Sequence, residues 1–262
     1  MDLDEVTYLA AADGNIDAVK IALANGADVN GRFLRGGTHK NDTMLCIASE
    51  KGRCDLVKFL LERGADPNLC DDDDSDIKPL LLARDERAID LLVASGAAVD
   101  YAVRIAGAYA AAGETALMEQ AGKGRIDCVR ALLRNGACFS LRDHDGRSAL
   151  DAAREILSHL PAINSMLTEK RRVYQGIVDL LTAVEAAGSW KAYVRKPVVA
   201  LLSLRYLCLA GRATPPPHLA RCFGAPPIAN ADKARTRARR AANNTPLPDE
   251  VFEHILAFWN FA

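Results

Sequence analysis

The chain has 262 residues, which is more than one typical domain of about 150 residues and less than two. Half of the residues are apolar and about a quarter are charged, as in proteins that build a hydrophobic core. Because 33 basic residues oppose 34 acidic ones, the net charge is -1, which excludes a general electrostatic attraction to nucleic acid or to an anionic membrane.

The cysteines and the N-terminal residues predict a compartment. There are seven cysteines, an odd number, and no Cys-x-x-Cys pair; this argues against a disulfide framework and a zinc site and favours reduced thiols. The first residues, MDLDEVTYL, are acidic and lack the apolar stretch of a secretory signal. The longest apolar run, VVALLSL, is too short to cross a membrane. We therefore expect a cytoplasmic protein, with the nucleus as an open alternative.

From the N-terminus onward, the chain repeats itself. Four segments share one ending: IALANGADVN, FLLERGADPN, LLVASGAAVD and ALLRNGACFS. Their glycines are separated by 38, 32 and 40 residues. A second signature precedes some of these endings, as in DTMLCIASEKG and GETALMEQAGKG. Such a period is typical of a repeat architecture in which each unit contacts only its neighbours.

These residues resemble the ankyrin repeat, whose pattern opens with Thr-Pro-Leu-His-x-Ala and closes with Leu-Leu-x-x-Gly-Ala-Asp. The opening is matched at Thr43, Leu45 and Ala48, at Pro79, Leu80 and Ala83, at Thr115 and Leu117, and at Ser148, Leu150 and Ala153. The resemblance implies an all-α solenoid of helix-turn-helix units. We expect five repeats, at 3–30, 41–70, 77–100, 113–140 and 146–188, with the third shortened and the fifth expanded. The second helix of the fifth repeat is expected at 174–188.

The residue types within one repeat have separate structural roles. A Thr or Ser before the first apolar residue caps a helix by accepting a backbone N–H bond. Val57, Leu60 and Leu61 fall on one helix face and are expected in the core. Gly64 and Gly136 stand where a helix must end in a left-handed turn, which glycine adopts without strain.

The resemblance implies that partners dock on the concave face, which is made by the loop tips and the first helices. Three tips are chemically distinctive, and we expect them to contact a partner. The alternative for each is a solvated loop. Their candidate residues are Arg32, Phe33, Leu34 and Arg35 in the first tip, Asp71, Asp72, Asp73 and Asp74 in the second, and Arg142, His144 and Arg147 in the third.

Three further segments follow the repeats. Residues 189–213 are expected to form a helix that covers the open end of the stack, because Val198, Leu201 and Leu202 follow helical spacing. Residues 214–246 are rich in Pro, Ala and Arg and are expected to be a linker. Its basic run, 233–240, is either a solubilising stretch, a nuclear import signal or a phosphate contact.

The last segment, 247–262, is expected to form an amphipathic helix that begins with Pro248 in its first turn. Its start, LPDEVFEHIL, resembles the first helix of an F-box, which joins substrate receptors to cullin-type ubiquitin ligases through an adaptor protein. The chain stops where an F-box would continue. The alternative is a helix that docks within the chain as a structural cap. The residues that would bind the adaptor are Leu247, Pro248, Val251, Phe252, Ile255, Leu256 and Trp259.

No catalytic or phosphate-binding motif occurs, and the five histidines have no ligand spacing, so we expect neither an enzyme nor a cofactor nor a metal site. The acidic tip lacks the Gly and Glu that a calcium loop requires. The sequence thus predicts a monomeric scaffold or interaction module that binds a protein partner. The alternative is the substrate-recognition adaptor of a ubiquitin ligase. Nucleic-acid and membrane partners are not expected.

Overall fold

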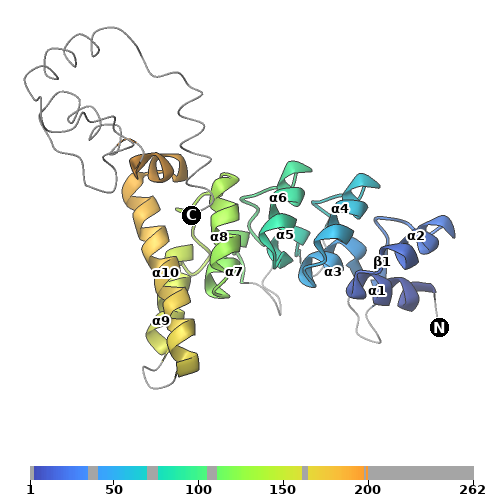
Figure 1. Ribbon diagram of the computed structural model, residues 1–262, viewed down its shortest axis with the longest axis horizontal. Helices are drawn as coiled ribbons and strands as arrows, with labels where there is room; N and C mark the ends of the chain where they lie inside the picture. The colour runs from blue at the N-terminus through green and yellow to red at the C-terminus, as the bar shows by residue number, and fades with distance from the viewer. Residues whose placement is uncertain are drawn as a thin grey trace, which may run out of the picture. The chain divides into compact units, whose positions relative to one another are not determined.

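A computed structural model describes residues 3–34, 41–69, 76–104, 111–160, 165–197 and 199 of the chain (Figure 1). The chain divides into two compact units, Met1–Tyr193 and Val194–Ala262, and the expected repeats fall in the first. No helix within the described ranges has the length and hydropathy of a membrane span.

The first unit is a stack of five helix pairs. First helices pack on first helices, and second helices pack on second helices, which gives two layers of helices. This is the all-α solenoid that the sequence predicts, and the prediction is confirmed. The pairs are α1 (Leu3–Asp13) with α2 (Ile16–Ala24), α3 (Met44–Glu50) with α4 (Cys54–Glu62), α5 (Pro79–Leu82) with α6 (Glu86–Ala94), α7 (Ala116–Gly122) with α8 (Ile126–Arg134), and α9 (Ala149–His159) with α10 (Ser165–Ala187).

The local signals act as expected. Thr43 accepts a hydrogen bond from the backbone N–H of Cys46 at the start of α3, and Ser148 forms a capping box with Asp151 at the start of α9. Gly64 ends α4 at φ +87°, in the left-handed region. The apolar stripes of the helices are buried and join into one core that runs through the whole stack. Stacking therefore supplies the core that no single repeat could bury.

Two elements depart from the regular unit. Helix α5 has only four residues, and Asp85 then caps α6 by accepting the N–H of Arg87 at 2.8 Å. Helix α10 begins at Ser165, so the expected start at residue 174 is wrong. The added residues include Glu169, Lys170 and Arg171, which have high helix propensity and extend the helix away from the core.

A small sheet accompanies the helices and was not predicted. Strands β1 (Arg32–Leu34) and β2 (Asn41–Thr43) pair antiparallel, with Arg32 opposite Thr43 and Leu34 opposite Asn41. The two strands thus hold the two ends of the first loop tip side by side. Pairing of this kind holds the base of the loop in place.

A polar ladder connects successive repeats at the ends of the second helices. The amide of Asn68 donates to the carbonyl of Gly96 at 2.8 Å and accepts the N–H of Ala98 at 2.9 Å. Asn30 bridges to Gly64 and Asp66 in the same way, one repeat earlier. The ladder fixes the spacing of the loops along the stack, since one side chain satisfies two backbone groups of the next repeat.

Beyond α10, residues 190–197 are helical. Trp190 and Tyr193, whose ring centroids lie 5.5 Å apart, pack against the core of the stack. Apart from Val199, the remainder of the expected helix at 189–213 lies outside the described residues, and so do the linker at 214–246 and the terminal helix at 247–262. The domain boundaries expected at 188, 213 and 246 stay predictions.

Candidate protein-interaction surface

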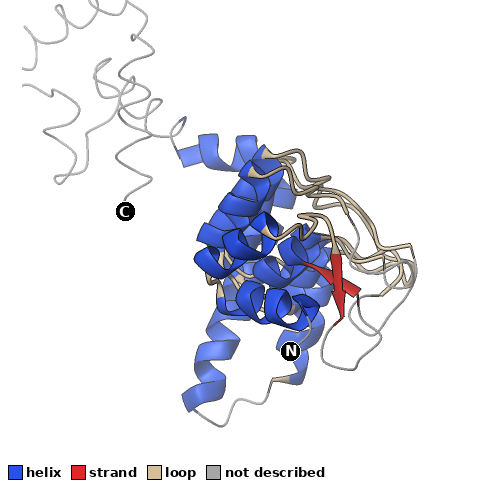
Figure 2. Ribbon diagram, turned by 90° about the vertical axis from the view of Figure 1, so that its right-hand side faces the viewer, coloured by secondary structure: helices blue, strands red, loops and turns tan. Residues whose placement is uncertain are grey.

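The first and second predicted tips are described only in part. Several long loops gather on the side of the helices where β1 and β2 lie (Figure 2). Arg32, Phe33 and Leu34 form β1, and Arg32 is half-buried. Arg35 and the acidic residues Asp71, Asp72, Asp73 and Asp74 lie outside the described residues. That these two tips contact a partner stays a prediction.

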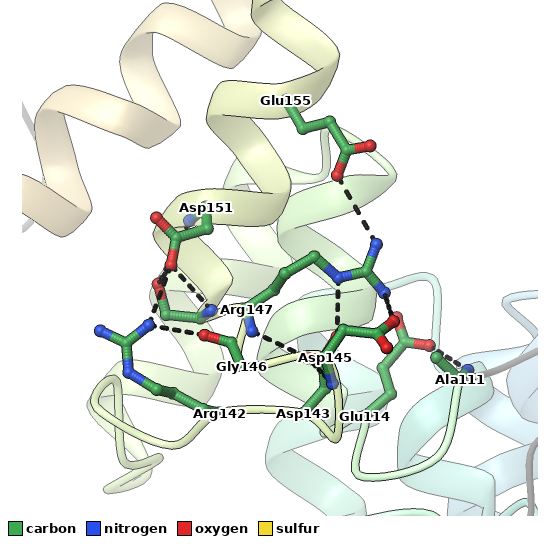
Figure 3. A network of polar contacts seen from close by, with 10 residues as sticks. Ala111, Glu114, Arg142, Asp143, Asp145, Gly146, Arg147, Asp151 and Glu155 are labelled. Carbon is green, nitrogen blue, oxygen red and sulfur yellow. Dashed lines mark hydrogen bonds and ion pairs between the residues drawn. The ribbon is translucent and has the colours of Figure 1, made fainter.

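The third tip is a rigid turn held by Arg147 and Asp143 (Figure 3). The guanidinium donates to the Asp143 carboxylate at 3.0 Å, and the same carboxylate accepts the backbone N–H of Arg147 at 2.8 Å. Arg147 also lies 3.2 Å from Asp145 and 3.6 Å from Glu155 of α9. Arg147 was predicted to contact a partner, but its guanidinium is paired with three carboxylates of the turn and of α9.

The other two predicted residues of this tip are also tied to the stack. Arg142 donates to the carbonyl of Gly146 at 2.7 Å and to the Asp151 carboxylate at 3.2 Å. The backbone N–H of His144 donates to the carbonyl of Ala112 in the preceding loop at 3.0 Å. The side chains of Arg142 and His144 are exposed, so the structure leaves both accessible to a partner on a fixed backbone.

The electrostatics of the turn favour its charged state. Burial alone would raise the pKa of Asp143, but the hydrogen bonds and the positive charge of Arg147 lower it below its ordinary value overall. Hydrogen bonds from Ser148, together with Arg142, lower the pKa of Asp151. At neutral pH the turn is therefore a set of ionised, mutually satisfied groups.

A groove lies between the first helices α7 and α9, beside this turn. Its cavity volume is about 220 Å³. The apolar part of its lining comes from both helices, and the carboxylates of Glu114, Asp143 and Glu155 lie around it together with Arg147. The groove was not predicted from the sequence, because its residues belong to two repeats. Its lining residues are Glu114, Met118, Gly122, Asp143, Arg147, Ser148, Ala152, Glu155 and Ile156.

A second polar contact that was not predicted joins the loops before α5 and before α7. Buried Asp76 pairs with Arg104, and Lys78 lies 3.6 Å from the ring centroid of Tyr101 in the same region. Asp76 has φ +53°, which is uncommon for a residue other than glycine. The loop that carries the predicted acidic tip is therefore anchored at its C-terminal end.

Two of the thiols in the described part of the chain have raised pKa values. Cys46, Cys54, Cys128 and Cys138 form no disulfide. Burial is the largest cause that raises the pKa of Cys54 and of Cys128 to about 11, so both are protonated at neutral pH. Within the described ranges, no group of three His, Cys, Asp or Glu side chains is placed to hold a metal ion.

Comparison with known proteins decides the kind of repeat. The family model of ankyrin repeats in three copies matches residues 3–71, and the single ankyrin-repeat model matches residues 112–144. This chain contains ankyrin repeats. The helix pairs of the third and fifth ankyrin repeats lie outside the two matches, and these are the repeats with a four-residue α5 and a lengthened α10.

One relative is a protein of Bos taurus named mitochondrial disaggregase. It is 33% identical over 171 residues, which are 64% of this chain and 24% of the relative. The ankyrin chain thus spans about a quarter of the length of the relative that it matches.

Proposed function

We propose that this ankyrin chain is a non-enzymatic module that binds a protein partner through the face made by its first helices and loop tips. The observation that carries the proposal is the groove between α7 and α9, which has an apolar lining beside a rigid charged turn. Small-molecule sites usually have about 300–1,000 Å³, and this groove, with about 220 Å³, suits a side chain of another protein better.

Two further features support protein binding. The asparagine ladder holds the repeats at constant spacing, so that a partner meets a preorganised surface. One relative of the chain bears the name mitochondrial disaggregase, and a disaggregase is, by its name, a protein that separates aggregates. Because the chain spans only a quarter of that relative, we do not extend a disaggregase activity to it. The first and second tips, at 31–40 and 71–76, are proposed to extend the contact surface.

Capture from eukaryotic lysate with a matched pair of variants tests this function. Ile156→Arg places a charge in the groove, and Ile21→Arg makes the same change at an exposed position of α2, in the other helix layer. We expect a set of proteins that binds the unmodified chain and Ile21→Arg but not Ile156→Arg. If both variants retain the same proteins, or if no protein is retained, this binding site is wrong.

We also propose, as a second candidate, that the chain is the substrate receptor of a cullin-type ubiquitin ligase. The support is the sequence LPDEVFEHIL within 247–262, which resembles the first helix of an F-box. The full chain is compared with a version truncated at Asn244. Recovery of the adaptor and cullin with the full chain alone is the expected result. If neither is recovered and truncation lowers the melting temperature, the segment is a structural cap, and this candidate is abandoned.

A further inference from the structure

We propose that the groove between α7 and α9 selects a linear peptide segment in which a Lys or Arg side chain stands beside an aliphatic one. This inference rests on the proposed function and specifies the chemistry of its partner. It follows from the charge of the groove, the nature of its lining and its size.

The charge of the groove is negative. Three carboxylates line it, those of Glu114, Asp143 and Glu155, against the single guanidinium of Arg147. That guanidinium is already shared among Asp143, Asp145 and Glu155. A carboxylate has about four acceptor positions, so Glu155 and Glu114 can still accept hydrogen bonds from an incoming cation. A phosphate backbone or an anionic membrane would be repelled.

The Glu114 carboxylate is held ready for such a contact. It accepts the backbone N–H of Ala111 at 2.7 Å, which fixes its orientation (Figure 3), and Glu114 is one of the residues that line the groove. Glu155 stands on α9 and is held by Arg147 from the other side. Two positioned carboxylates from different repeats are a preorganised site for an ammonium or guanidinium group, which loses little freedom by binding there.

The lining between these carboxylates is apolar. Met118 and Gly122 of α7 line the groove together with Ala152 and Ile156 of α9. A Cβ on Gly122 would lie 4.0 Å from the Cβ of Ala152, so the two helices approach closely and the floor is shallow. Ile156 is 37% exposed and is the largest apolar side chain that the groove offers to solvent. An aliphatic side chain of a peptide would cover it, while a neighbouring basic side chain reaches the rim.

Selection from a random peptide library, displayed on phage and exposed to the immobilised full chain, tests this inference. We expect enriched peptides to carry Lys or Arg within two residues of Leu, Ile or Met. The binding of enriched peptides is then measured by fluorescence anisotropy with the protein variants and at increasing salt. Because the contact includes ion pairs at the surface, affinity should fall as the salt concentration rises.

The variants separate charge from apolar contact. Glu114→Gln with Glu155→Gln keeps an acceptor oxygen at each position and removes both charges, and we expect affinity to fall about three- to tenfold. Ile156→Ser should lower affinity about tenfold. The matched controls, Glu62→Gln with Glu86→Gln and Ile21→Ser, change exposed positions of the second helices and should leave affinity unchanged. Circular dichroism and the melting temperature confirm that each variant is folded.

The outcomes distinguish this inference from the function on which it rests. Acidic or purely apolar enriched peptides overturn the proposed chemistry, as do basic peptides that bind the groove variants and the unmodified chain equally. An absence of enriched peptides also overturns it, because a preformed groove should bind a linear segment. In each of these cases, lysate proteins that are lost with Ile156→Arg but kept with Ile21→Arg would still support a protein-binding module.

Discussion

The carboxylate of Asp76 accepts two hydrogen bonds from the guanidinium of Arg104, at 3.0 Å from Nε and 3.1 Å from Nη2. It also accepts the backbone N–H of Arg104 at 3.0 Å. Asp76 is 3% exposed and stands in the left-handed region, at the end of the predicted acidic tip. This pair raises the pKa of Arg104 and joins two loops that lie 28 residues apart in sequence.

Removal of this carboxylate should destabilise the stack. We expect Asp76→Gly to lower the free energy of unfolding by about 1–3 kcal/mol, because the hydrogen bonds are lost while the backbone conformation remains easy to adopt. Asp76→Ala should cost about 1 kcal/mol more, since a Cβ disfavours a positive φ. Urea denaturation measures both values. Equal stability of the two variants would show that the backbone at Asp76 carries no such cost.

The asparagine ladder makes a second prediction. Asn68→Ala removes hydrogen bonds to two backbone groups of the next repeat, at 2.8 and 2.9 Å, and should lower the free energy of unfolding by about 1–2 kcal/mol. Asn30→Ala should cost less, because its bond to Gly64 is longer, at 3.4 Å. Urea denaturation of both variants is the measurement. A larger loss for Asn30→Ala would contradict this ranking.

Two glycines with similar backbone angles should respond differently to alanine. Gly64 has φ +87° and open space around it, so Gly64→Ala should cost about 1–2 kcal/mol of stability from backbone strain alone. Gly113 has φ +83°, and an added Cβ would lie 2.7 Å from the backbone nitrogen of His144. Gly113→Ala should therefore cost about 1–3 kcal/mol more than Gly64→Ala. Thermal unfolding of the two variants tests this difference, and similar melting temperatures would argue against the close packing of the two loops.

The turn at 142–147 predicts a pH dependence. The pKa of Asp143 lies below its ordinary value of 3.8 in the folded chain, so the unfolded chain binds more protons at acidic pH. The contribution of ionised Asp143 to the free energy of unfolding is fully present when the pH is above the ordinary pKa. It is lost as the pH falls from the ordinary pKa to the lower pKa of the folded chain. Asp143→Asn should have a free energy of unfolding about 1 kcal/mol below that of the unmodified chain at neutral pH. This difference should become smaller in acid, where Asp143 is protonated. Urea denaturation across this range checks it, and a constant gap would be the contrary result.

Much of the repeat architecture can be read from residues that lie close together in sequence. Thr43, Thr115 and Ser148 cap their helices as predicted, and Gly64 and Gly136 end theirs in the left-handed region. Caps and turns depend on groups within a few residues, and for this reason they leave a local pattern. The Asp143–Arg147 pair is also local, at a spacing of four residues, and its turn-closing role could have been considered from the sequence.

The sequence pattern alone therefore establishes the number and order of the repeats, their apolar stripes and the loops that carry charge. Only the folded stack decides that Arg147 is turned toward Glu155, that Asp76 meets Arg104 and that Met118 and Ile156 line one groove. Met118 and Ile156 belong to different repeats, and their meeting depends on how one helix pair is rotated and spaced against the next. Packing between repeats sets that rotation, and no residue within a single repeat carries it.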